Sequence, residues 1–64
     1  MTRIRTLIVE DELIIARDIE RQLIALGHHP VGMATSGEEA MALAASLQPQ
    51  LVLMDIHLSG QMDG

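Results

Sequence analysis

The apolar residues of this chain fall into runs whose spacing changes along the sequence. Residues 4–9, with a continuous apolar run at 7–9, and the apolar run at 51–54 are typical of strands that are buried on both faces. Between Leu13 and Leu26, apolar residues instead recur at helical spacing, and Gly27 is a natural end for such a helix. The pattern therefore predicts a strand, then an amphipathic helix, at the start of the chain.

A second strand and a second helix are predicted between these segments. Residues 29–35 alternate between larger and smaller side chains, and Pro30, which has no N–H to donate, favours an edge position. Residues 35–48 read as a helix in which Ser36 and Glu39 have the spacing of a capping box, and Pro49 ends it.

The order strand, helix, strand, helix, strand predicts an α/β fold with a parallel sheet. We expect the spatial order 2-1-3, the first half of a doubly wound sheet. Strand 51–54 then lies at an edge although it is as apolar as a central strand, so we expect further sheet, or a second copy of the chain, to pair with it. Met33, Met41 and Met54 occupy apolar positions and are predicted to fill the core.

Composition excludes several classes of protein. The formal net charge of −5 and the absence of Phe, Tyr and Trp argue against direct nucleic-acid binding. There is no cysteine for disulfides, and no apolar stretch is long enough to cross a membrane or to serve as a signal peptide. We therefore expect a cytoplasmic protein without membrane contact.

Carboxylates follow two of the predicted strands. Glu10, Asp11 and Glu12 come after the first strand and Asp55 comes after the third. Since the carboxyl ends of parallel strands meet at one edge of a sheet, these acids should converge, and oxygen ligands of this kind suit Mg²⁺. Acids after a strand also serve as helix caps, an interpretation that we favour for Glu12 and that competes for Asp11.

Three segments together resemble the receiver domain of bacterial two-component response regulators: LIVEDE, TSGEEAMALA and PQLVLMDIHLSGQMDG. The resemblance covers essentially all 64 residues. It implies a flavodoxin-like fold, whose strand order 2-1-3-4-5 is a named example of the doubly wound sheet. It also implies a phosphorelay protein that accepts a phosphoryl group from a sensor histidine kinase with Mg²⁺.

The resemblance assigns roles to individual residues. Asp55 matches the phosphoacceptor, Asp11 a direct Mg²⁺ ligand, and Glu10 a neighbour that acts through water. His57 lies where the family uses a backbone carbonyl as a metal ligand. Residues 1–64 then correspond to a partial receiver with strands 1–3 and helices 1–2, and the chain has no lysine to match the one that drives the family's switch.

Two other functions compete with this one. An Mg²⁺-dependent phosphohydrolase resembling the haloacid dehalogenase family would use an Asp-x-Asp motif, but here Asp55 is followed by Ile56 and His57, so we do not expect an enzyme. A non-signalling fragment that pairs with a receiver or a kinase would have the same sequence pattern, and the residues leave that alternative open.

Overall fold

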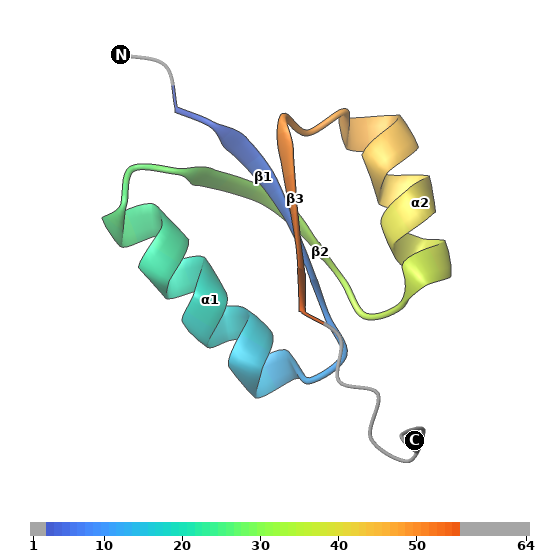
Figure 1. Cartoon of the computed structure of the whole chain (residues 1–64), viewed down its shortest axis with the longest axis horizontal. Helices are drawn as coiled ribbons and strands as arrows, with labels where there is room; N and C mark the ends of the chain where they lie inside the picture. The colour runs from blue at the N-terminus through green and yellow to red at the C-terminus, as the bar shows by residue number, and fades with distance from the viewer. Residues whose placement is uncertain (1–2, 56–64) are drawn as a thin grey trace.

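The computed structural model describes residues 3–55, which form a three-stranded parallel sheet with one helix on each face (Figure 1). The strand order is β2-β1-β3, as predicted. The elements in chain order are β1 (Arg5–Glu10), α1 (Leu13–Ala25), β2 (His29–Ala34), α2 (Gly37–Leu47) and β3 (Leu51–Asp55). Neither helix in this part of the chain has the length and apolar character needed to cross a membrane.

The central strand β1 is the core of the molecule. Leu7, Ile8 and Val9 are fully buried, which confirms the prediction of a strand covered on both faces. Because successive side chains of a strand point to opposite faces, these residues feed two separate clusters. Leu7 and Val9 pack on the α2 side, and Ile8 packs on the α1 side. The α2-side cluster is completed by Ala34 and Ala40, and the α1-side cluster by Ala16 and Leu23.

The predicted capping box is present at the start of α2, with one change of partner. The Ser36 hydroxyl oxygen accepts a hydrogen bond from the Glu39 backbone N–H at 3.1 Å. The Glu39 carboxylate reaches back to Thr35, whose backbone N–H and hydroxyl donate to it at 2.8 and 3.0 Å. These bonds lower the pKa of Glu39, the backbone bond more than the hydroxyl bond.

Both helices end where the sequence predicts, within one residue. After α1, the N–H of Gly27 donates to the carbonyl of Ile24 at 3.0 Å and that of His28 donates to Leu23 at 2.9 Å, the pattern of a Schellman motif. The motif needs a left-handed residue, and Gly27 supplies it with φ 91°. After α2 the same backbone region is occupied by Gln48, with φ 48°.

Arg5 ties the end of α2 to the sheet, an interaction that the sequence pattern did not reveal. Its guanidinium donates to the carbonyl oxygens of Leu47 and Gln48, the latter at 2.7 Å. A cation at these carbonyls complements the negative end of the helix dipole. The backbone of Arg5 also exchanges hydrogen bonds with Gln50, which fixes the entry into β3.

One expectation about apolar positions was wrong, and another was met in an unusual way. Met41 and Met54 are 75% and 60% exposed, so neither fills the core as predicted. All five residues of β3 are exposed, although its sequence reads as a buried strand. The reason is topological, since β3 is the last strand of the described sheet and hydrogen-bonds only to β1 within it.

Candidate functional site

The predicted acidic residues come together at the carboxyl ends of β1 and β3. The two strands pair in parallel with unbroken register from Thr6 opposite Leu51 to Glu10 opposite Asp55. Glu10 and Asp55 are therefore neighbours on adjacent strands, which lie about 4.8 Å apart. Asp11 follows directly at the point where the chain leaves the sheet for α1. Both strands extend one residue further than predicted, so Glu10 and Asp55 belong to the sheet.

Glu10 is the buried member of this group. Its side chain is fully shielded from solvent, and one carboxylate oxygen accepts a hydrogen bond from the backbone N–H of Glu12 at 3.0 Å. Glu12 is the N-cap residue of α1, as favoured from the sequence, but its own side chain accepts no capping bond. Glu10 thus fixes the turn between β1 and α1.

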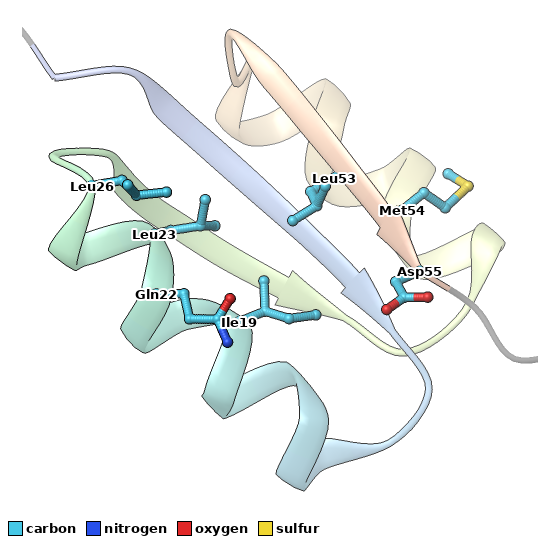
Figure 2. Close-up of a pocket in the computed structure, with 7 residues that line it drawn as sticks. All are labelled: Ile19, Gln22, Leu23, Leu26, Leu53, Met54 and Asp55. Atoms are coloured by element: carbon cyan, nitrogen blue, oxygen red, sulfur yellow. The ribbon is translucent and has the colours of Figure 1, made fainter.

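Asp55 is the exposed member, and it stands at one end of a groove between α1 and β3 (Figure 2). The groove has a volume of about 390 Å³. Its walls are mainly apolar: Ile19, Gln22 and Leu23 from α1 and Leu26 just after it, with Leu53 and Met54 from β3. A reagent approaching Asp55 along this groove passes a mainly apolar surface on which Gln22 and Asp55 are the polar side chains.

The sequence predicted an amphipathic helix here but not the groove beside it. Ile19, Leu23 and Leu26 do recur at helical spacing on α1, which is the signal that was available. Only Leu23 is buried, however, while Leu26 is 74% exposed. The difference arises because β3, which faces this end of the helix, has no further layer above it in the described structure.

The donor atoms at the site fit Mg²⁺ in kind. Asp11 and Asp55 offer hard carboxylate oxygens, and Mg²⁺ usually takes one or two protein carboxylates and keeps several waters. Within residues 3–55, no three His, Asp or Glu side chains are gathered as a site built from side chains alone would need. The fourth predicted contributor, the backbone carbonyl of His57, lies outside the described residues.

Comparison with known proteins agrees with this arrangement. The response regulator receiver domain family matches residues 6–64, nearly the whole chain. This chain belongs to the response regulator receiver domain family. The flavodoxin-like fold and the place of the chain among two-component regulators, both implied by the sequence motifs, are thereby confirmed.

Individual relatives in the family are regulators of several kinds. The chain is 42% identical over 59 residues to the phyllosphere-induced regulator PhyR of Methylorubrum extorquens, covering 91% of this chain and 22% of that protein. It is 43% identical over 54 residues to the transcriptional regulatory protein PdtaR of Mycobacterium tuberculosis, covering 84% and 26%. With the response regulator GacA of Pseudomonas viridiflava it shares 41% over 58 residues, covering 89% and 27%.

A solved structure shows the same fold. The crystal structure of the anti-anti-sigma factor PhyR from Bartonella quintana superimposes with a TM-score of 0.84 and 38% sequence identity, covering 100% of this chain and 26% of that one. The chain thus spans about a quarter of the length of the relatives that it matches. What the comparisons share with this chain is the receiver segment.

Proposed function

We propose that this chain is a phosphoacceptor module of a two-component phosphorelay, in which Asp55 accepts a phosphoryl group. The observation that carries the proposal is the register of β1 and β3. It sets the exposed Asp55 beside the buried Glu10, with Asp11 one residue further on, at the carboxyl edge of a parallel sheet. Residues 1–64 correspond to the first half of a receiver, with strands 1–3 and helices 1–2.

In this proposal Asp55 acts as a nucleophile. A carboxylate oxygen of Asp55 bonds to phosphorus while the bond between phosphorus and the donor's histidine nitrogen breaks, and that nitrogen keeps the electron pair. Exposure of Asp55 at the end of its groove leaves the oxygen within reach of a donor. Because Asp55 lies on a strand rather than a loop, its backbone is held opposite that of Glu10.

Mg²⁺ held by Asp11, Asp55 and the backbone carbonyl of His57 would offset negative charge on the transferring group. The role of Glu10 is structural and differs from that of the metal ligands. Its carboxylate holds the backbone N–H of Glu12 and so fixes the turn that carries Asp11. Removing Glu10 would therefore displace Asp11 even without direct contact between Glu10 and a metal ion.

The first turn of α1 supports docking of a protein donor in the cytoplasm, which we propose to be a sensor histidine kinase. Ile14 is 84% exposed and Leu13 is 56% exposed, and both lie within three residues of Asp11. Exposed apolar side chains beside an acidic site are suited to contact with a partner protein.

The proposal is tested by incubating the 64-residue chain with acetyl phosphate and following its intact mass. We expect one phosphoryl group to be added in the presence of Mg²⁺ and little addition when the metal is chelated. Asp55→Asn should abolish the addition. Asp18→Asn is the matched control, since Asp18 is an exposed aspartate on α1 whose carboxylate accepts a bond from Gln22.

Two results would contradict the proposal. If the Asp55→Asn variant were phosphorylated as much as the unsubstituted chain, another residue would be the acceptor. Sustained hydrolysis of a phosphomonoester would favour the phosphohydrolase alternative over the acceptor module, if Asp55→Asn abolished that hydrolysis.

A further inference from the structure

The register of β3 on β1 decides where Asp55 lies. In the observed register Asp55 lies opposite Glu10. Leu53 and Asp55 lie on the side of the sheet that faces α1 (Figure 2). Successive side chains of a strand alternate between the two faces, so a shift of one residue would move every side chain of β3 to the other face. A shift that brought Asp55 opposite Val9 would therefore turn its carboxylate to the α2 side, where Val9 packs.

The sequence of β3 does little to specify this register. Register is normally specified because a shift would exchange a buried apolar face of the strand for a polar one. Leu51–Met54 is apolar at every position, so a shifted strand would present much the same side chains to both faces. Residue-specific contacts at the end of the strand are therefore needed to set the register.

Gln50 makes such a contact, one residue before β3. Its backbone N–H donates to the carbonyl oxygen of Arg5 at 2.8 Å, and its side-chain Oε1 accepts the backbone N–H of Arg5 at 2.9 Å. Residues of a strand are spaced about 3.3 Å apart, so a shift of one residue would break both bonds. A shift in one direction would also bring Pro49 to the place of Gln50, and proline has no N–H to donate.

The side chain of Arg5 holds the chain just before Gln50. Its guanidinium donates to the carbonyl oxygens of Leu47, the last residue of α2, and of Gln48. These bonds limit how far the segment between α2 and β3 can slide along β1. Arg5 is the first residue of β1, the strand whose last residue is Glu10. One residue thus ties both the end of α2 and the approach to β3 to the central strand.

We propose that Arg5 and Gln50 are positioning residues for Asp55: they fix the register of β3 on β1, and that register sets Asp55 opposite Glu10. Neither residue reaches the phosphoryl donor, because Gln50 precedes Asp55 by five residue steps of an extended chain, about 16 Å. The inference rests on the proposed function of Asp55 as the acceptor. The register itself can be measured without any phosphorylation.

Two replacements of Gln50 separate its hydrogen bond from the length of its side chain. Gln50→Met keeps the length but removes the good acceptor for the Arg5 N–H, whereas Gln50→Glu keeps an acceptor oxygen. Nuclear Overhauser effects between β1 and β3 in the 64-residue chain show whether Met54, as observed, or Asp55 lies opposite Val9. We expect Gln50→Met to lower the ratio of observed to shifted register about fivefold, the factor that corresponds to one net hydrogen bond.

The phosphorylation rate is the second measurement on the same variants. With acetyl phosphate and Mg²⁺, the initial rate should fall in Gln50→Met in proportion to the fraction that keeps the observed register. Gln50→Glu should keep both the register and the rate of the unsubstituted chain. An undisturbed register in Gln50→Met, with a rate equal to that of Gln50→Glu, would overturn the proposal.

Arg5→Met tests the side-chain contact in the same two measurements, with Arg21→Met as the matched control because Arg21 is exposed on α1. We expect Arg5→Met to shift the register and slow phosphorylation, and Arg21→Met to do neither. Slower phosphorylation with an unchanged register would overturn the proposal. If Arg5→Met does not fold, the Gln50 pair decides, since Gln50 is exposed and its replacement leaves the core intact. An unsubstituted chain that is not phosphorylated would contradict the proposed function, while the register would still test this inference.

Discussion

Replacing Ser36 by alanine tests whether α2 is held at its start by the observed cap. The Ser36 hydroxyl accepts the backbone N–H of Glu39, one of the N–H groups that a helix cannot satisfy internally. Loss of such an N-cap costs about 1 kcal/mol of the free energy of unfolding. In a domain of this size that loss lowers the melting temperature by roughly 4–8 °C. Thermal unfolding followed by far-UV circular dichroism measures it.

The chain provides a control in which the same change from serine to alanine should raise the melting temperature instead of lowering it. Ser46 is exposed within α2, where alanine is the better helix former by about 0.5 kcal/mol, so Ser46→Ala should raise the melting temperature slightly. The two variants should therefore differ by about 1.5 kcal/mol. If Ser36→Ala were as stable as Ser46→Ala, the hydroxyl would not be capping the helix and the reasoning about α2 would fail.

Three further changes probe the same framework. The pKa of Glu39 lies below its ordinary value of 4.5, because the backbone N–H of Thr35 and, to a smaller extent, its hydroxyl donate to the Glu39 carboxylate. The stability that these bonds contribute is present above pH 4.5 and is lost as the pH falls through the lowered pKa. In pH-dependent unfolding, Glu39→Gln should therefore remove this part of the acid sensitivity. Gly32→Ala places a Cβ 2.8 Å from the Leu47 side chain, and overpacking should cost about 1–3 kcal/mol in urea unfolding unless Leu47 turns aside. Gly27→Ala meets no neighbour but must adopt φ 91°, so we expect a loss of about 1–2 kcal/mol in the same assay, and an unchanged midpoint would contradict the Schellman motif.

The sequence predicted the fold well where one residue fixes one local geometry. Pro30 identified the β2 edge, Gly27 the end of α1, and Ser36 with Glu39 the start of α2. The apolar run of β1 identified the buried central strand. Each of these signals acts over a few residues or reflects burial on both sides of one strand, so each could be read without knowing the rest of the fold.

The sequence was misleading where the outcome depends on what lies next to a strand. Leu51–Met54 is as apolar as β1, yet it is exposed, because hydrophobicity records which residues favour burial and not whether a neighbour covers them. The prediction that Met54 fills the core was wrong for the same reason. The contact of Arg5 with the end of α2 joins residues more than 40 positions apart, and no local pattern encodes it.

At the candidate site, too, some features could be predicted from the sequence and others required the structure. That Glu10, Asp11 and Asp55 meet at one edge followed from strand order alone. That Glu10 is buried and holds the N–H of Glu12, while Asp55 is exposed at the end of a groove, required the structure. Strand polarity therefore predicted which residues assemble, and packing determined how each of them can act.

The most direct test of the central claim is to locate the phosphoryl group on the unsubstituted chain. After reaction with acetyl phosphate and Mg²⁺, borohydride reduction converts an aspartyl phosphate to homoserine, and cleavage after Arg21 releases residues 22–64 for fragmentation by mass spectrometry. This piece also carries Glu38, Glu39 and Asp63, so the assignment discriminates between four carboxylates. We predict homoserine at position 55 alone. Modification at Asp63, or spread over several carboxylates, would contradict the assignment of Asp55 as the acceptor.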